Sequence, residues 1–475
     1  MSIDEETARY KKSHPDASLE EIKRAKVTAL YRVCHPDMPL DIGDPLAHRY
    51  YIDFSPVREG QAVDKIYDQI ALWNPHIPTC QLFTGHMGCG KSTELLTLGS
   101  RLRKEGFHVV HFESDKHLEM GDLGVVDILI LMARQVIRED ELRDMIPQQQ
   151  ISAKQIREYI AGMYGKIEKI VNEVGVPIPG LETVGISIRG IVKIFGDLLK
   201  QAKDSPDFRG TLREHLDPDT NRILEAINQE LIEPVVSSLK KKGKKGLVII
   251  VDGMDRMGEI SASSGKAQSQ NLFIDRGEQL KLLKCHVVYT FPFGLIFSTT
   301  AVKLKHKFDG YYVLPMIPVR HNNGDENQEG MELLRQMVLT RAFPYETARQ
   351  RLERITEIFD TPETLDALCQ VSGGHARNLM VLFQDCIKRE RHLPISSESL
   401  AHVVQKTRND WRLGVLDVPD GWELLRKVRE NKMIQEHRKY YQLLQNLFVL
   451  EYRDPSEGSW FEVNPILKDA KELNP

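Results

Sequence analysis

The sequence lacks most of the features that mark membrane-bound, disulfide-stabilised or zinc-dependent proteins. It begins Met-Ser-Ile-Asp-Glu-Glu, without the basic start and apolar core of a signal peptide, and no apolar run approaches the length that spans a bilayer. Only six cysteines occur in 475 residues, far apart and without a C-x-x-C pair, so neither a zinc site nor a disulfide framework is indicated. We therefore expect a cytoplasmic protein with no membrane contact.

Strong charge of either sign is also missing. The formal net charge is −4, so the chain as a whole does not attract nucleic acid. One dense basic run, residues 240–245, can be interpreted as a solvated turn or as a contact to a phosphate backbone. With 41% hydrophobic and 28% charged residues, the chain is long enough to form two to four domains.

What the sequence does contain is a glycine-rich segment, Gly-His-Met-Gly-Cys-Gly-Lys-Ser at residues 85–92, which fits the pattern G-x-x-x-x-G-K-[ST]. Residues 79–84 before it are typical of a buried strand, and residues 92–98 after it have helical spacing. Glycines let such a loop curl with its N–H groups toward a phosphate, Lys91 supplies a cation, and Ser92 offers a hydroxyl to Mg²⁺. The segment predicts a bound nucleoside triphosphate, with candidate residues Gly85, Gly88, Cys89, Gly90, Lys91, Ser92 and Thr93.

A second apolar run ends in acidic residues. Residues 247–251 are Leu-Val-Ile-Ile-Val, as expected of a parallel strand buried on both faces, and Asp252-Gly253-Met254-Asp255 follows directly. An acid at the carboxyl end of such a strand lies beside the phosphate loop, where Asp252 can hold Mg²⁺ through a water. We therefore expect Mg²⁺ to accompany the nucleoside triphosphate, with Ser92 and Asp252 at the metal.

Three further segments, residues 107–112, 285–291 and 312–317, have the apolar character of buried strands. Together with the two strands above, they predict a parallel α/β sheet whose ligand lies at the carboxyl ends of the strands.

These motifs resemble those of P-loop ATPases of the AAA+ and STAND classes. Most AAA+ ATPases place a glutamate directly after the Walker B aspartate to orient the attacking water, whereas this chain has Gly253 there. The D-G-h-D order resembles STAND signalling ATPases, which implies Asp255 as the hydrolytic carboxylate; a helix N-cap is the alternative role. The resemblance also implies that Thr290, at the end of the next strand, senses the γ-phosphate, although a threonine there can be purely structural.

A third motif, Ser-Gly-Gly-His-Ala-Arg-Asn-Leu at residues 372–379, resembles the helix start of the AAA+ lid. It implies Arg377 as a second sensor, the alternative being an ordinary arginine in the first turn of a helix. Arg256 and Arg276 follow the Walker B strand and are candidates for an arginine finger. The residues expected to act in hydrolysis are thus Lys91, Asp255, Thr290 and Arg377.

The resemblance implies an α/β fold: a P-loop NTPase parallel sheet with a helical lid and a C-terminal winged-helix-like domain. The expected organisation is an N-terminal helical extension at 1–50, a P-loop core at 51–320 with a helical insertion at about 120–240, a lid at 321–398 and a winged-helix-like domain at 399–475. Within the insertion, helical spacing predicts helices at 151–171 and 221–239, the second broken near Pro234, and residues 185–188 alternate like a strand.

The function implied by this resemblance is an ATP-hydrolysing, oligomerising switch or motor that acts on a separate effector, in a setting such as bacterial anti-phage defence. Residues 1–50 are too few for a catalytic domain, and no repeat of solenoid period is visible, which is why the effector is expected on another chain. The alternative is a DNA-binding ATPase of the initiator or loader type, using its winged helix; acidic residues in the expected wing argue against that contact. A small-molecule kinase is a third option, in which the lid motif has no obvious place.

Overall fold

The structure, a computed structural model, describes residues 3–36, 40, 43–58, 62–146, 188–203, 205–257, 268–435, 437–454 and 458–474. The chain divides into two compact units: residues 1–62, 85–97 and 313–475 form the first, and residues 63–84 and 98–312 form the second. The helix predicted at 151–171 lies outside the described residues, as do the first three residues of the strand predicted at 185–188.

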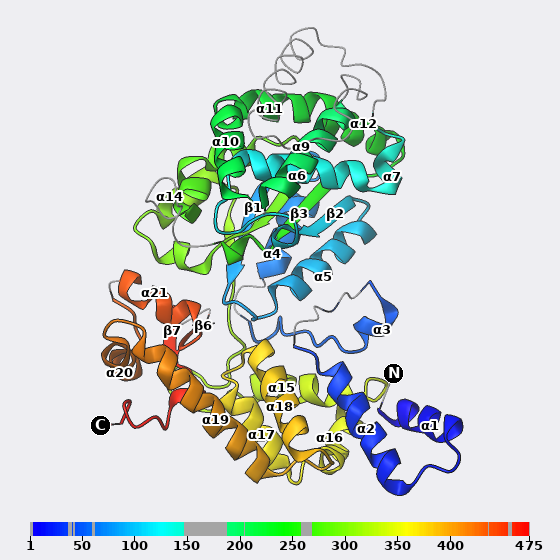
Figure 1. Cartoon of the computed structure of the whole chain (residues 1–475), viewed down its shortest axis with the longest axis vertical. Coiled ribbons are helices and arrows are strands. Elements are labelled where there is room, and N and C mark those ends of the chain that lie inside the picture. Colours follow the sequence, from blue (N-terminus) through cyan, green and yellow to red (C-terminus); the bar gives the residue numbers. More distant parts are fainter. Residues whose placement is uncertain are drawn as a thin grey trace. The chain divides into compact units, whose positions relative to one another are not determined.

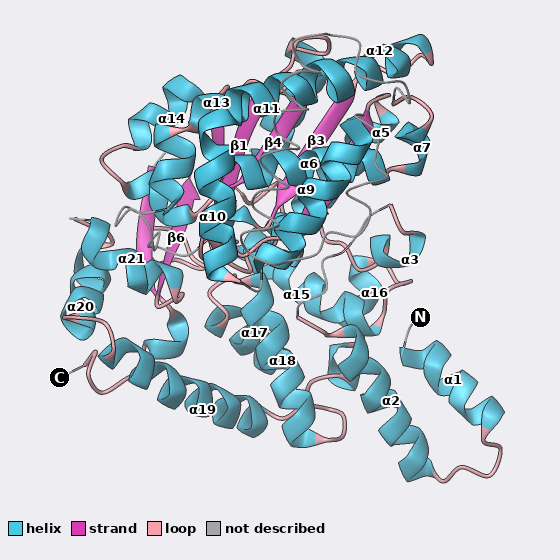
Figure 2. Cartoon of the chain, turned by 45° about the horizontal axis from the view of Figure 1, so that its top comes forward, coloured by secondary structure: helices cyan, strands magenta, loops and turns pink. Residues whose placement is uncertain are grey.

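A five-stranded sheet in the order β2-β3-β4-β1-β5 is the centre of the second unit (Figure 2). Its strands are β1 (Cys80–Gly85), β2 (His108–Glu113), β3 (Leu247–Asp252), β4 (His286–Thr290) and β5 (Tyr311–Leu314). β1 pairs in parallel with β4, β4 with β3, and β3 with β2. Every residue of β1, β3 and β4 is buried, which explains why these strands appear in the sequence as nearly continuous apolar runs.

Helices pack on this sheet through one large hydrophobic cluster that runs from Cys80 to Phe308. The most buried helix is α6 (Val125–Arg138), which is covered along most of its length and packs against α9 (Ile188–Lys203) and α11 (Thr220–Ile227). The other helices of this unit are α7 (Asp140–Arg143), α10 (Pro206–Leu216), α12 (Glu233–Lys241), α13 (Gly277–Lys281) and α14 (Ala301–Lys307), while α4 (Ala62–Asp68) and α5 (Lys91–Lys104) enter it from the first unit.

The helix predicted at 221–239, with a kink or break expected at Pro234, is not interrupted there; its irregularity is a π-helical turn just before Pro234. α11 ends at Ile227, a π-helical turn follows at Asn228–Ile232, and α12 begins at Glu233. Pro234 thus lies in the first turn of α12, where a residue without a backbone N–H leaves no hydrogen bond unmade. The π turn, in which one extra residue is taken up, was not predicted.

The first unit contains helices and one antiparallel hairpin (Figure 1). Its helices are α1 (Ile3–Ser13), α2 (Leu19–Val33), α3 (Pro45–His48), α15 (Gln328–Ala342), α16 (Ala348–Glu353), α17 (Pro362–Val371), α18 (Ala376–Glu390), α19 (Ser397–Leu416), α20 (Gly421–Asn431) and α21 (His437–Gln445). The hairpin pairs β6 (Val449–Asp454) with β7 (Gly458–Val463). The interpretation of residues 399–475 as a winged helix stays a prediction.

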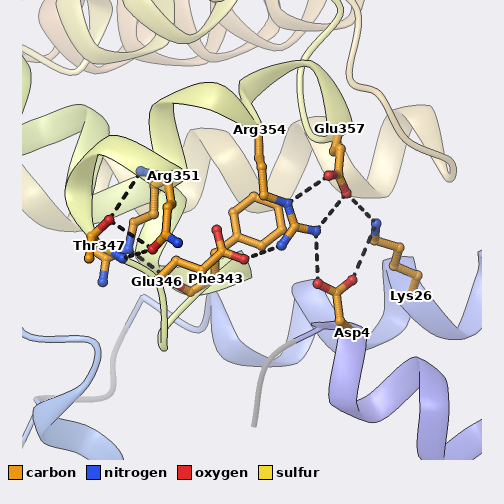
Figure 3. Close-up of polar contacts among 9 residues, drawn as sticks. Asp4, Lys26, Phe343, Glu346, Thr347, Arg351, Arg354 and Glu357 are labelled. Carbon is orange, nitrogen blue, oxygen red and sulfur yellow. Dashed lines mark hydrogen bonds and ion pairs between the residues drawn. The ribbon is translucent and has the colours of Figure 1, made fainter.

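The N-terminal helices share a hydrophobic core with the lid helices α15 to α18. A polar network at their edge is centred on Arg354, whose guanidinium pairs with Asp4 at 2.9 Å, with Glu357 at 2.7 Å and with Glu346, and lies 3.9 Å from the Phe343 ring centroid (Figure 3). These partners raise the pKa of Arg354 above its ordinary value, the hydrogen bond with Glu357 being the largest cause. The extension therefore packs as part of the lid.

Among the described residues, no helix combines the length and apolarity that crossing a bilayer requires.

Candidate phosphate-binding site

The segment between β1 and α5 has the backbone of a phosphate-binding loop. Gly88 (φ +80°) and Gly90 (φ +106°) adopt the left-handed conformations that glycine tolerates best. A Cβ at Gly88 would lie 2.8 Å from the His375 ring, so no larger residue fits there. The order of strand, loop and helix beside a parallel sheet confirms the predicted α/β fold of P-loop NTPases.

The Lys91 side chain is hydrogen-bonded to the backbone at the start of this loop. This side chain is buried, with 6% of the residue exposed, and the ammonium donates to the carbonyl oxygens of Gly85 at 3.0 Å and His86 at 2.9 Å. A cation held against two neutral carbonyls can exchange them for phosphate oxygens, with which it interacts more strongly. This geometry fits the role expected of Lys91.

Arg58 supports the loop from the segment before α4. Its guanidinium donates to the Cys89 carbonyl at 2.7 Å and lies 3.6 Å from the Glu94 carboxylate. Cys89 itself is fully buried, with its sulfur 3.9 Å from the Leu314 carbonyl, which is the environment of a small core residue. Thr93 accepts a hydrogen bond from the Leu40 N–H at 3.3 Å.

The lid contacts the loop through the start of α18. His375 is the N-cap residue: its Nδ1 accepts from the Asn378 N–H at 3.0 Å, and its Nε2 donates to the Met87 carbonyl at 2.6 Å. The Arg377 N–H also donates to the Gly88 carbonyl, at 3.2 Å. Because Nδ1 accepts a hydrogen bond and Nε2 donates one, these bonds require the neutral tautomer of His375 that is protonated at Nε2.

The C-terminal hairpin contacts the same loop. The Glu451 N–H of β6 donates to Nε2 of the buried His86 ring at 2.9 Å. Tyr452, the next residue, donates its hydroxyl to the Gly373 carbonyl of the lid at 2.7 Å. The Glu451 carboxylate, 1% exposed as a residue, pairs with Arg453 at 2.8 Å. We call the meeting of loop, lid and hairpin the histidine junction, consisting of His86, Met87, Gly373, His375, Glu451 and Tyr452.

Both histidines of the junction are held neutral. Burial lowers the pKa of His86 to about 3, and the nearby charges of His375 and Lys91 add to this. Burial also lowers the pKa of His375 to about 4, opposed by its hydrogen bond to the Met87 backbone. A neutral ring is the form that His375 needs for its two hydrogen bonds, so geometry and electrostatics agree.

The Walker B strand of the second unit ends in a tight turn. Gly253 has φ +82°, and a Cβ there would lie 2.6 Å from the Asp115 carboxylate. A glutamate at this position would therefore be strained and would collide with Asp115. The position directly after Asp252 is thus closed to a glutamate by the backbone and by Asp115. Asp252 is buried, and its Oδ1 accepts the Gly253 N–H at 2.7 Å.

Asp255 and Thr290 both lie close to the turn at Gly253. Asp255 is half-buried in the 3₁₀ turn Met254–Arg256, and so it is not an N-cap residue. The Thr290 hydroxyl accepts the Met254 N–H at 2.9 Å and lies 3.4 Å from the Val251 carbonyl. It thus ties β4 to the turn that carries Asp255, and its sensor role stays a prediction.

The two arginine-finger candidates are ion-paired within the second unit. Arg256 pairs with Asp115, and Arg276 lies 3.6 Å from Asp217. Among the described residues, no three His, Cys, Asp or Glu side chains gather as a metal-binding group.

The structure brings the predicted residues together in two sets. In the first unit, Arg377 meets the loop of Gly85 to Thr93; in the second, Thr290 meets the turn between Asp252 and Asp255. Within the first unit, the glycine conformations, the buried Lys91 and Ser92 at the start of α5 fit a loop that binds phosphate. The sequence prediction missed the roles of Arg58, His86, His375 and Glu451, although both histidines lie inside motifs that it identified.

No family model matches this chain, and no curated protein matches it. Solved structures with some similarity include the Walker-type ATPase of Pyrococcus abyssi, at 11% identity over 88% of this chain and 96% of that chain with a TM-score of 0.41. The ORC2 protein of Aeropyrum pernix, solved in ADPNP-ADP complexes, has 13% identity over 93% and 96% with a TM-score of 0.40. Cdc6p from Pyrobaculum aerophilum has 10% identity over 90% and 96% with a TM-score of 0.33. Similarity this low carries no argument about function, which rests on the residues of this chain.

Proposed function

We propose that this protein is an ATP-binding and ATP-hydrolysing switch of the AAA+/STAND type. The observation that supports this best is the histidine junction, where lid and hairpin are both hydrogen-bonded to the loop that carries Lys91. Lys91 and the junction share one residue: the His86 carbonyl accepts from Lys91, and the His86 ring accepts from β6. When Lys91 leaves that carbonyl for a phosphate, the His86 carbonyl loses a hydrogen bond, and the environment of the His86 ring changes with it.

In this proposal ATP is the nucleotide, and Ser92 and Asp252 are the Mg²⁺ residues, as the sequence predicts. Asp255 acts as the base for the attacking water, while Arg377 and Thr290 respond to the γ-phosphate. The output is a change in the packing of lid and hairpin, because a loop with two hydrogen-bonded neighbours cannot change its partners without affecting them. Self-association and a separate effector protein, in a setting such as a bacterial defence system, complete the proposal by resemblance alone.

The alternative of a DNA-binding initiator gains little from the hairpin. Residues Val449 to Tyr452 of β6 are buried, and Glu451 and Tyr452 are engaged with loop and lid. A hairpin used in this way is a packing element, which favours the switch over a wing that enters a DNA groove.

The first experiment separates binding from hydrolysis. Asp255→Asn should bind Mg·ATP normally while hydrolysis falls by about 10²- to 10⁴-fold, the range for loss of a general base. Asp252→Asn should also weaken Mg²⁺ binding, and the exposed Glu278→Gln should change neither. If Asp255→Asn hydrolyses ATP at the wild-type rate, the proposed base is wrong.

The second experiment tests the coupling. Amide hydrogen exchange of β6 and of the first turn of α18 should change when Mg·ATP is added to Asp255→Asn, and should not change in Lys91→Ala. Identical exchange with and without Mg·ATP, at saturating nucleotide, would contradict the switch.

The third experiment concerns partners. Asp255→Asn purified from its native host in Mg·ATP should come with a second copy or a stoichiometric companion, measured by native mass spectrometry. Recovery of monomer alone would count against self-association and the effector.

A further inference from the structure

A small cavity in the second unit is lined by residues other than those of the phosphate loop. Its volume is about 280 Å³, and it is lined by residues of the 3₁₀ turn Ser114–Lys116, of α6 and of α9. The described lining includes five cations, Lys116, Arg134, Arg138, Lys200 and Lys203, together with His117. None of the described lining residues is acidic.

The wall of the cavity between these cations is apolar. Leu118, Leu131 and Leu199 are each at most 8% exposed. Burial lowers the pKa of His117, and the cations Arg138, Arg134, Lys203 and Lys116 lower it further in that order. Burial and the charge of Arg138 also lower the pKa of Arg134. Cations that lower one another's pKa in this way repel each other, and a group of such cations attracts an anion.

Few carboxylates neutralise this cluster. Arg134 lies 3.6 Å from Asp197, and Lys116 pairs with Glu113 at 2.8 Å. Arg138, Lys200 and Lys203 have no ion pair with any carboxylate among the described residues; Lys203 reaches only the Asp115 carbonyl, at 3.5 Å. Because most of these cations lack a carboxylate partner among the described residues, they repel one another, and a bound anion would relieve that repulsion.

We propose that this cavity is a binding site for a small phosphate-bearing anion. Guanidinium groups bind phosphate oxygens in pairs and ammonium groups bind them as point charges, and the cavity offers two of the first and three of the second. Its volume lies near the lower end of the range for small-molecule sites, about 300 Å³, which suits a diphosphate or triphosphate group.

The cavity is connected to the Walker B turn through its own lining. Lys116 follows Ser114, whose hydroxyl donates to the Asp252 carbonyl at 2.9 Å, and Asp115, whose carboxylate pairs with Arg256. An anion held by Lys116 and Lys203 therefore fixes the turn that supports Asp252 and Asp255. The site would act as an effector site for hydrolysis; only this last step rests on the proposed function.

The test measures binding of inorganic tripolyphosphate by calorimetry in Lys91→Ala, where the phosphate loop no longer contributes. We expect one binding site per chain. Adding Arg138→Glu and Lys200→Glu, both at exposed positions, should weaken it by about tenfold or more, since charge-assisted hydrogen bonds are lost and repulsion replaces them. The matched control is Lys193→Glu, an exposed lysine of α9 that does not line the cavity and should leave affinity unchanged.

Three results would overturn the proposal: no binding to Lys91→Ala, equal affinity in the double charge reversal, or an equal loss in the Lys193→Glu control. A fourth is binding of a short DNA duplex, lost on charge reversal, without any binding of tripolyphosphate, which would make the cavity part of a nucleic-acid surface. Should the double reversal unfold, Arg138→Gln should still weaken binding severalfold. Absence of ATP hydrolysis in the wild type would remove the proposed function and leave this binding result unaffected.

Discussion

The sheet of the second unit and the histidine junction of the first unit depend on different kinds of interaction. In β3 of the second unit, five consecutive apolar side chains are buried, and their stability comes from area removed from water, about 25 cal/mol per Å². The histidine junction of the first unit is built from His86, His375 and Glu451, which are just as buried but polar. Each of them has a particular hydrogen-bond or ion-pair partner across the junction or beside it.

This difference distinguishes the sheet, which serves as a scaffold, from the junction, which we propose as the switch. Apolar packing tolerates small shifts, whereas a buried polar group gains about 1 kcal/mol from its hydrogen bond and loses more when the partner is removed. The junction therefore favours one arrangement of loop, lid and hairpin strongly over neighbouring ones. A ligand that changes a single hydrogen bond at the loop can change that preference, which is why function is expected here.

The largest effect should come from Lys91→Ala, which acts on the loop and leaves the sheet intact. Loss of charge-assisted bonds to phosphate should weaken Mg·ATP by about 4 kcal/mol, or about 10³-fold, in calorimetry. Lys104→Ala, at the other end of α5, should keep wild-type affinity. Equal affinity in both variants would show that the loop does not bind the nucleotide through Lys91.

The next largest effect should be a dependence of the free energy of unfolding on pH, to which the two junction histidines contribute most. His86 and His375 are neutral when folded, with pKa values of about 3 and about 4, but take up protons below about pH 6.5 when unfolded. Below pH 6.5 the unfolded state therefore binds more protons than the folded state. The free energy of unfolding is largest above pH 6.5, and it falls as the pH is lowered toward the pKa values of the folded state. Between pH 7 and 5.5 the two histidines should together cost about 2–3 kcal/mol, measured by urea denaturation.

The double variant His86→Gln, His375→Asn should remove most of this dependence of the free energy of unfolding on pH. Part of it should remain, because burial also lowers the pKa of His286 in the second unit to about 4. His392→Gln, at an exposed position, serves as the control. An unchanged slope in the double variant would mean that the junction histidines do not carry the effect.

The sheet could be predicted from the sequence because its signal is local. All five strands were predicted within three residues of their ends, and the phosphate loop followed from its fixed spacing. The helices α1, α10 and α20 were not predicted individually. Both α1 and α10 are polar along much of their length, which weakens their apolar spacing, whereas α20 has an apolar face with Leu424, Leu425 and Val428.

The junction could not be predicted, for a reason that is also physical. The Met87–His375 bond joins residues 288 positions apart, and the His86–Glu451 bond joins residues 365 apart. Periodicity indicates which face of an element is buried, but not which polar groups meet across the fold. His86 occupies a free position of the phosphate-loop pattern, so the motif itself gives no reason to examine it.

A third prediction distinguishes capping from contact with the loop. His375→Ala removes both an N-cap and the bond to Met87, and should lower the free energy of unfolding by about 2 kcal/mol and weaken Mg·ATP binding. Thr361→Ala removes an N-cap of α17 that does not contact the loop, and should cost about 1 kcal/mol without affecting the nucleotide. His375→Asn should recover stability but not affinity. If all three bind Mg·ATP equally, the contact with the loop has no functional role.

The smallest predicted effect compares one tyrosine hydroxyl in each unit. Tyr452→Phe removes the hydrogen bond to the Gly373 carbonyl, while the stacking of its ring on Trp460, at 5.5 Å between centroids, is retained. The cost should be about 1 kcal/mol in urea denaturation, because the carbonyl loses its partner in a buried place. Tyr312→Phe in β5 loses a half-buried hydroxyl that makes no hydrogen bond with any described residue, and should stay within about 0.5 kcal/mol of wild type. If Tyr452 belongs to a switch, its variant should also show faster amide exchange in β6 at saturating Mg·ATP, and Tyr312→Phe should not. Equal exchange in the two variants would reduce Tyr452 to an ordinary buried hydrogen bond and limit the junction to its two histidines.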